Sequence, residues 1–161
     1  MRPLAEFETA ARARLGSIAE ELDLDSFQAV WLLHESAAAT RRHLERVLTP
    51  HGLSWSQFEI LWQLWLFGAQ EHAEIVADVA VSKASVTAIT TELSARGLIA
   101  RTPSVRDRRR VSYALTRKGI TLMRHLFPPF NRAEAEASRG LTPDEKVELA
   151  ALLRRLIAPT P

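Results

Sequence analysis

The sequence predicts a mainly α-helical fold that carries one small β-hairpin. Apolar residues recur at three- and four-residue spacing over most of the chain, which is the pattern of amphipathic helices. Val111, Tyr113 and Leu115 instead alternate with small or polar residues, as in a half-buried strand. Residues 106–110, which read RDRRR, come just before this strand and are expected to form the tip of the hairpin.

Size and composition indicate a single globular domain. The chain has 161 residues, of which 47% are apolar, so it can bury a core. It contains no run of 18 apolar residues and no apolar signal segment near its N-terminus. A soluble cytoplasmic protein without a membrane partner is therefore expected. The absence of cysteine excludes disulfides and thiolate metal sites.

Two helices are expected before residue 53. The first covers residues 4–22, and the second begins after Ser26 and ends at residues 49–52, which read TPHG. The apolar stripe of the first helix consists of Leu4, Phe7, Ala11, Leu15, Ile18 and Leu22. Because this stripe has nothing in its own segment to pack against, another surface must cover it.

Two further helices are expected in the middle of the chain. Ser54 and Gln57 form a capping box, and the helix that they start should stop at Gly68. A short helix follows at residues 73–79, and the dipeptide at residues 80–81 forms the turn after it.

The next helix begins at Ser82, whose hydroxyl can accept from an amide of the first turn. Val86, Ile89 and Leu93 form its apolar face. Gly97 follows, where a left-handed residue commonly ends a helix. A short helix, a tight turn and a capped second helix form a helix-turn-helix, and the hairpin behind it is expected to serve as its wing. The sequence therefore predicts a winged helix-turn-helix.

Two helices are expected after the hairpin. Thr116 caps the first, which must kink or stop at Pro128 and Pro129 because these residues lack backbone donors. Residues 142–145, which read TPDE, form a capping box with proline at the first helical position. The final helix has a wide apolar face made of Leu149, Leu152, Leu153, Leu156 and Ile157. A second copy of the chain is the simplest partner for the terminal helices, so a homodimer is expected.

Positive charge is concentrated around the predicted hairpin. Residues 82–118 hold 9 Lys/Arg and 2 Asp/Glu, a net charge of +7. The other residues hold 12 Lys/Arg and 17 Asp/Glu, a net of −5, and the whole chain is only +2. A concentrated basic field beside a polar helix is typical of a DNA-binding surface. For the arginines alone, a solvated basic hairpin is the alternative.

This region resembles the winged helix-turn-helix of the MarR family of bacterial transcription regulators. The matching residues are VSK at 81–83, LSARGLI at 93–99, and DRR at 107–109 with the trailing LT at 115–116. The Asp107 and Arg109 pair corresponds to the D-x-R signature of the family's wing.

The resemblance implies three functional regions and a function. Residues 1–50 would form N-terminal helices for dimerisation and a cleft, residues 51–118 the DNA-binding domain, and residues 119–161 the C-terminal dimerisation helices. The implied function is a repressor that binds a pseudo-palindromic operator in double-stranded DNA as a homodimer. A small, often aromatic, anion would release it.

The recognition helix is expected to enter the major groove, where its N-terminal residues reach base edges. The polar residues on its outer face are Lys83, Ser85, Thr87 and Thr91. Each hydroxyl has the alternative of bonding to its own helix. Ala84 and Ala88 stand where the family often has serine and arginine, so sparse base readout and a larger role for DNA shape are expected.

The wing is expected to enter a narrow minor groove, where negative potential attracts arginine. The candidates are Arg106, Asp107, Arg108, Arg109 and Arg110. By the resemblance, Asp107 holds Arg109 in place and Arg109 enters the groove. The alternative is that Asp107 is only a turn residue.

A ligand cleft is expected to be lined by aromatic residues of the second and third helices. The candidates are Trp31, His34, Trp55, Phe58 and Trp62. An aromatic stripe at helical spacing is more often core than pocket, and His34 is either a core histidine or a ligand donor. The first helix is similar to that of the urate-responsive members, but Ile89 replaces their recognition-helix arginine, which argues against urate.

No catalytic site, cofactor or metal is expected. The sequence lacks a glycine-rich phosphate loop, an HExxH motif and a nucleophile elbow. His34 and Glu35 are adjacent on a helix and point about 100° apart, so this pair cannot clamp a metal. The competing interpretation is a ligand-independent winged helix that serves as a protein-interaction or dimerisation module. A neutral wing would be expected in that case.

Overall fold

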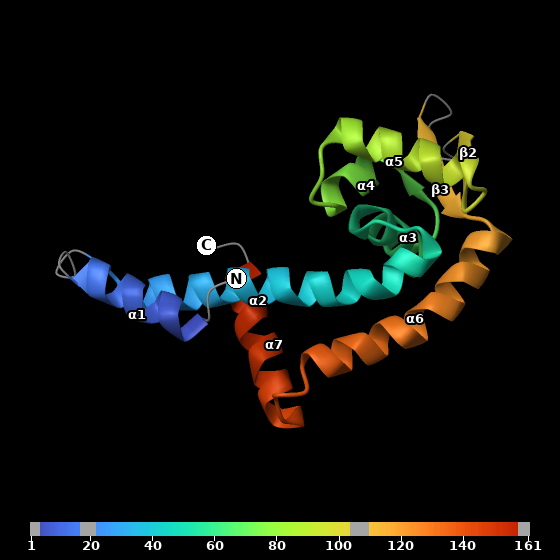
Figure 1. Ribbon diagram of the computed structural model, residues 1–161. Helices are drawn as coiled ribbons and strands as arrows, with labels where there is room; N and C mark the ends of the chain where they lie inside the picture. Colours follow the sequence, from blue (N-terminus) through green and yellow to red (C-terminus); the bar gives the residue numbers. More distant parts are fainter. Residues whose placement is uncertain (1–3, 17–21, 104–109, 158–161) are drawn as a thin grey trace. The chain divides into compact units, whose positions relative to one another are not determined.

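The computed structural model describes residues 4–16, 22–103 and 110–157, in two compact units that divide after Arg41. The elements are α1 (Leu4–Leu15), α2 (Leu24–Leu48), the 3-10 helix Thr49–His51, α3 (Trp55–Phe67), β1 (Gln70–Glu71), α4 (His72–Asp78), α5 (Lys83–Ala95), β2 (Ile99–Pro103), β3 (Val111–Leu115), α6 (Arg117–Ala137) and α7 (Pro143–Ile157) (Figure 1). The strands form one antiparallel sheet in the order β1-β3-β2. The predicted fold class, mainly α with a small β wing, is confirmed.

In the unit of residues 1–41, α1 and the first part of α2 are joined by aromatic stacking. The rings of Phe7 and Trp31 lie 4.3 Å apart and nearly parallel. The prediction that α2 starts after Ser26 is wrong, since it starts at Leu24. Asp23 caps it, because the Ser26 amide donates to Asp23 Oδ1 at 2.9 Å and the Ser26 hydroxyl to Oδ2 at 2.6 Å. Residues 17–21 of the predicted first helix lie outside the described residues.

In the unit of residues 42–161, the core lies between α3, α5, α6 and the sheet. Its fully buried side chains are Leu48, Ile60, Leu61, Ile75, Val86, Leu93, Met123 and Leu126. Burial of each such side chain contributes about 1.5–3 kcal/mol. This core fixes α3, which lies between α4 and α6, and α5, which packs against β2 (Figure 1).

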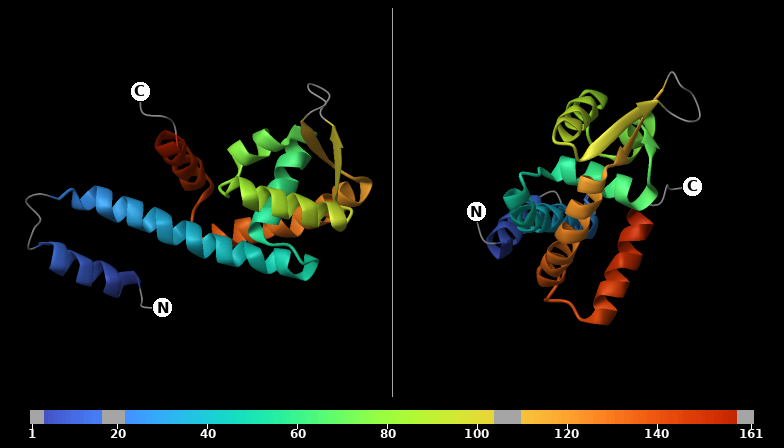
Figure 2. Two further views of the ribbon diagram at one scale, coloured as in Figure 1. Left: turned by 90° about the horizontal axis from the view of Figure 1, so that it is seen from above. Right: turned by 90° about the vertical axis from the view of Figure 1, so that its right-hand side faces the viewer.

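The wing contains one strand more than the sequence predicted. β2 pairs with β3 in a register that sets Arg101 opposite Tyr113. β1 adds two residues on the other side of β3, with Gln70 opposite Tyr113 and Glu71 opposite Ser112. Figure 2 shows the hairpin beside α5 from two further directions.

The predicted caps of the middle helices are confirmed. The Gln57 amide donates to the Ser54 hydroxyl at 3.3 Å, and the Ser54 amide donates to the Gln57 side chain at 3.0 Å. The Ser85 amide donates to the Ser82 hydroxyl at 3.1 Å. α4 starts at His72, one residue before its predicted start.

The junction between α5 and α6 is tightly packed. Gly97 has φ 69°, a left-handed conformation that follows the end of α5 and that glycine adopts without strain. The Thr116 amide donates to the Leu98 carbonyl at 3.0 Å, and the Thr116 hydroxyl donates to the Gly97 carbonyl at 2.7 Å. A Cβ on Gly119 would overlap the Leu98 carbonyl oxygen. The start of α6 therefore lies directly on the residues that lead into β2.

Of the two outcomes predicted at Pro128-Pro129, a kink or a stop, the stop does not occur, since α6 continues to Ala137. A proline leaves the carbonyl four residues earlier without its helical donor. Those carbonyls belong to Arg124 and His125, both exposed, so water can satisfy them. Phe130 and Ala133 are buried beyond the prolines, and this burial favours continuing the helix.

The last helix begins at the predicted capping box and leaves its apolar face uncovered. The Thr142 amide donates to Glu145 Oε2 at 2.7 Å. Leu152 is 48% exposed and Leu156 64%, and none of the residues of α7 is buried. None of the helices in the described ranges is long and apolar enough to cross a lipid bilayer.

Candidate nucleic-acid interface

The turn between α4 and α5 places α5 with one face inward and one face outward. The Val81 amide donates to the Val79 carbonyl at 2.8 Å, which closes the turn. Val86, Thr90 and Leu93 are buried on the inner face. The outer face exposes Lys83, Ala84, Thr87, Ala88 and Thr91, and Ser85 is half-buried. Three of the four predicted major-groove residues, Lys83, Thr87 and Thr91, therefore belong to one exposed helix face, and Ser85 lies at its half-buried edge.

The hydroxyl protons of the two threonines on this face are already donated within the helix. Thr87 Oγ1 donates to the Lys83 carbonyl at 3.0 Å, and Thr91 Oγ1 donates to the Thr87 carbonyl at 2.8 Å. Ser85 Oγ lies 2.8 Å from Ser82 Oγ. Each threonine thus offers a hydroxyl oxygen as an acceptor and a methyl group to a partner.

Of the five predicted wing residues, the structure describes Arg110, and residues 106–109 lie outside the described residues. Arg110 Nη1 lies 3.0 Å from Glu71 Oε2. The Glu71 side chain is only 8% exposed, whereas that of Arg110 is 64% exposed. The charge-assisted hydrogen bond therefore ties the start of β3 to β1 at the base of the wing.

A concave surface that the sequence did not reveal lies between α5 and the wing, and we call it the α5 hollow. It measures about 640 Å³. Its lining residues are Glu71, His72, Ala73, Val76, Lys83, Thr87, Arg101, Arg110, Val111 and Tyr113. Lys83, Arg101 and Arg110 outnumber the one acid of the described lining, Glu71, which is paired with Arg110, so the lining is basic.

Arg101 and His72 were not among the sequence candidates. Arg101 pairs with Tyr113 across the strands, so both side chains lie on one face of the sheet. The Tyr113 ring lies 6.1 Å from that of His72. The alternation of side chains along β2 was the available signal in the sequence. Arg101 is two residues after the buried Ile99, so the two side chains lie on the same face of the strand.

The pKa of His72, which lines the α5 hollow, is lowered from its usual value. Burial lowers the pKa of the His72 imidazole, and the charges of Lys83 and Arg101 lower it further. His72 Nε2 lies 3.5 Å from Thr87 Oγ1. At neutral pH the imidazole is therefore neutral, and the basic character of the α5 hollow comes from its lysine and arginines.

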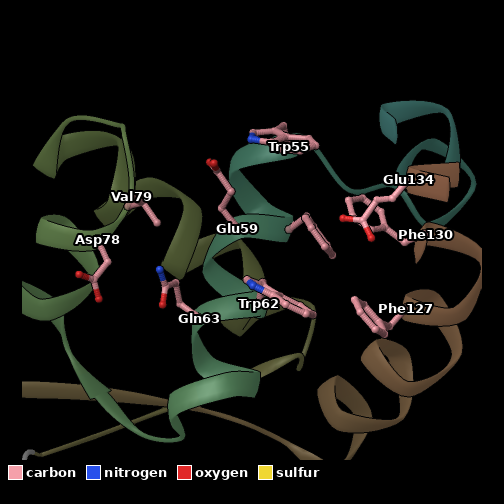
Figure 3. Close-up of a pocket in the computed structure, with 10 residues that line it drawn as sticks. Trp55, Glu59, Trp62, Gln63, Asp78, Val79, Phe127, Phe130 and Glu134 are labelled. Carbon is pink, nitrogen blue, oxygen red and sulfur yellow. The ribbon is translucent and has the colours of Figure 1, made fainter. Parts of the chain in front are cut away.

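Three of the five predicted ligand residues meet on α3 at a second concave surface, which we call the α3 hollow. It measures about 300 Å³. Its lining residues are Trp55, Phe58, Glu59, Trp62, Gln63, Asp78, Val79, Phe127, Phe130 and Glu134 (Figure 3). The rings of Trp62 and Phe127 lie 4.9 Å apart, and those of Phe58 and Phe130 lie 4.4 Å apart. Phe58 and Phe130 belong to the core, whereas Trp55, Trp62 and Phe127 are only partly buried.

The other two predicted ligand residues belong to the unit of residues 1–41. Trp31 lines a hollow of about 170 Å³ between α1 and α2, together with Phe7 and Phe27. The indole N–H of Trp31 is buried without a hydrogen-bond partner in the described part of the chain. His34 is an exposed side chain of α2. Among the described residues, no three His, Cys, Asp or Glu side chains are placed to hold a metal ion.

A capped helix with an outward polar face beside a basic wing defines a winged helix-turn-helix DNA-binding protein. The sequence profile of the MarR family matches residues 53–111, from the segment before α3 to the start of β3. The uncharacterized HTH-type transcriptional regulator YwaE of Bacillus subtilis is 33% identical over 138 residues, which cover 85% of this chain and 81% of YwaE. The chain belongs to the MarR family of transcription regulators.

Two further similarities extend this result. The HTH-type transcriptional repressor NicR of Pseudomonas putida is 32% identical over 101 residues, which cover 63% of this chain and 64% of NicR. The structure of Bordetella bronchiseptica BpsR matches with a TM-score of 0.73 and 27% identity, over 80% of this chain and 92% of BpsR. That structure concerns the regulation of BpsR DNA binding by 6-hydroxynicotinic acid.

Proposed function

We propose that this MarR-family regulator is a repressor that binds a pseudo-palindromic operator as a homodimer and is released by a small aromatic ligand. The observation that carries the proposal is the outward face of α5 beside the basic α5 hollow. In the resulting complex, α5 lies in the major groove, with Lys83, Ser85, Thr87 and Thr91 facing the DNA. The wing residues Arg106, Asp107, Arg108, Arg109 and Arg110 lie at the adjacent minor groove.

In this complex, the α5 hollow contacts the phosphate backbone of the DNA. Lys83 and Arg101 both line it, one from the recognition helix and one from β2. A phosphate between them would be held from the helix and from the wing at once, which fixes the register of the protein on the duplex. Since the partner is chromosomal DNA, the protein acts in the cytoplasm, and it acts by binding, without catalysis.

A homodimer is supported by the uncovered face of α7. Leu149, Leu152 and Leu156 are 44%, 48% and 64% exposed in the single chain. Contiguous exposed leucines on a helix are typical of a protein–protein interface. Two-fold symmetry in the protein requires two half-sites in the DNA, about one helical turn apart.

A ligand response is supported by the α3 hollow and by the similarity to BpsR. Trp55, Phe58 and Trp62 contribute aromatic walls to this hollow. Trp31 and His34 remain predicted ligand residues, and Trp31 has a buried N–H that can donate to a ligand.

The experiment that tests the proposal is a selection of bound sequences from random duplex DNA by the full chain at one fixed salt concentration. The expected result is an enriched inverted repeat with half-site centres about 10 base pairs apart. A pool without any enriched motif would contradict DNA-binding specificity. An enriched single half-site without a repeat would contradict the dimer.

A further inference from the structure

The charged residues of the α3 hollow all have the same sign. Glu59 comes from α3, Asp78 from the end of α4, and Glu134 from α6, so three separate elements each contribute a carboxylate. Among the described residues that line this hollow there is no lysine, arginine or histidine. In Figure 3, Glu59, Gln63 and Asp78 lie on the α4 side of the hollow, and Glu134 lies beside Phe130 on α6.

These carboxylates are not neutralised within the described part of the chain. Glu134 accepts a hydrogen bond from the Asn131 amide at 2.9 Å, which leaves its charge in place. Neither Glu59 nor Asp78 has an ion-pair partner among the described residues. Like charges around one concave surface raise the free energy of the empty state, and a bound cation lowers it.

The uncharged polar and aromatic groups of the α3 hollow also suit a bound cation. Gln63 Oε1 is buried and has no hydrogen-bond partner in the described residues, so it offers an unused acceptor. Trp55, Trp62 and Phe127 are partly exposed rings in the wall of the hollow. Aromatic faces attract cations through the quadrupole of the ring, and tryptophan does so most strongly. Carboxylates, an amide acceptor and aromatic faces are all groups that attract an organic cation.

We propose that the α3 hollow binds a small organic cation with one aromatic ring, such as an arylalkyl amidinium or ammonium ion, in preference to an aromatic acid. This assignment rests on the proposed function in one respect, since it takes the α3 hollow as the site where the ligand that releases the regulator from DNA binds. A volume of about 300 Å³ accommodates a single ring with a short charged arm. An aromatic carboxylate of the same size would enter a hollow whose described lining holds three carboxylates and no cation.

The test compares three ligands of nearly equal shape and different charge on the full chain by calorimetry. The probes are phenylacetamidinium, phenylacetamide and phenylacetate, which carry a positive, a zero and a negative charge. We expect the amidinium to bind about tenfold tighter than the amide, and the acetate to bind more weakly than the amide. Equal affinities for the three, or tightest binding of phenylacetate, would overturn the proposal.

Substitutions of the lining carboxylates test whether the cation binds in the α3 hollow. Glu59→Gln and Asp78→Asn each remove one charge while keeping the shape of the side chain, and each should lower the amidinium affinity severalfold and leave the amide affinity unchanged. Glu148→Gln is the matched control, since this exposed residue of α7 does not line the hollow. Circular dichroism confirms that the variants fold. A preference for the amidinium that survives both hollow variants would mean that the cation binds elsewhere.

DNA binding is measured separately on the duplex obtained from the selection. Loss of DNA affinity on addition of phenylacetamidinium supports both the ligand class and the release mechanism. Charge-dependent binding without any effect on DNA affinity supports the ligand class and contradicts release through this hollow. Specific DNA binding with no charge preference in the calorimetry overturns the ligand class alone.

Discussion

The α5 hollow and the α3 hollow have opposite charge, although both lie in the unit of residues 42–161. Lys83, Arg101 and Arg110 line the first, with Glu71 as the one acid of the described lining. The α3 hollow has three acids and no base among its described lining residues. A nearly neutral chain can therefore separate its charges by site, and the local charge rather than the net charge indicates the partner.

The two hollows depend on the same packed junction between α5 and α6, and a substitution at Gly119 should disturb both. Gly119→Ala should lower the free energy of unfolding by about 3 kcal/mol, because the new Cβ overlaps the Leu98 carbonyl oxygen. Leu98 leads into β2, which lines the α5 hollow, and Gly119 lies in α6, which lines the α3 hollow. Urea denaturation followed by circular dichroism measures the effect.

The control is Gly140→Ala. No atom lies within 4 Å of a Cβ at this position, and Gly140 is not among the glycines with positive φ. We expect a change within about 0.5 kcal/mol. Equal loss of stability in the two variants would mean that the α5–α6 junction is not tightly packed.

A substitution at Arg101 tests whether the basic α5 hollow contacts DNA. Arg101→Ala should weaken operator binding by about 1–3 kcal/mol and reduce the slope of affinity against salt by about one ion, because it removes a cation from the α5 hollow. Fluorescence anisotropy at several salt concentrations provides both values. Arg124→Ala removes the same charge from an exposed position of α6 that lines neither hollow, and it should change neither. If the two variants behave alike, the α5 hollow does not contact the phosphates.

Asp107 distinguishes an ordered wing from a diffuse basic patch. Asp107→Ala makes the wing more positive, yet it should weaken DNA binding by about 1 kcal/mol if the carboxylate holds Arg109 in position. The matched substitution Asp144→Ala, on exposed α7, controls for the change in net charge. Tighter binding of Asp107→Ala at one fixed salt concentration would show that the wing acts through charge alone.

The smallest expected effect is a dependence of stability on pH at the α5 hollow. The pKa of His72 in the folded state is lowered from 6.5, so the unfolded chain takes up a proton first as the pH falls. The stability contributed by neutral His72 is therefore complete above about pH 6.5 and is lost as the pH falls through the lowered folded pKa. Urea denaturation at pH 7.5 and 5.5 should show the loss, and His72→Gln should reduce it. An unchanged pH dependence in His72→Gln would assign the effect to other groups.

Local features of the fold could be predicted from the sequence because their causes are local. Ser54, Ser82 and Thr116 each accept a hydrogen bond from an amide within three residues, and such caps are recognisable from spacing alone. Asp23 was the exception, because Asp23 and Ser26 are both good caps and the structure uses the first. The continuation of α6 beyond Pro128-Pro129 depends on the burial of Phe130, which is tertiary information.

The sites were predicted less completely for the same reason. The polar face of α5 follows from helical spacing, and the three aromatic residues of α3 follow from it too. The α5 hollow joins Arg101 to residues of α4 and α5, and the α3 hollow joins Glu59, Asp78 and Glu134 from three elements. No spacing along the chain brings such residues together. β1 was missed because two residues are too short for a periodic pattern.

The engaged hydroxyl protons of Thr87 and Thr91 have a consequence for the base sequence of the operator. With their protons donated to Lys83 and Thr87 carbonyls, these side chains present an acceptor oxygen and a methyl group. In the major groove, guanine offers N7 and O6, both acceptors, whereas adenine and cytosine offer amino groups and thymine a methyl. We expect the selected operators to be poor in guanine opposite Thr87 and Thr91, and any guanine in the half-site to lie within reach of Lys83.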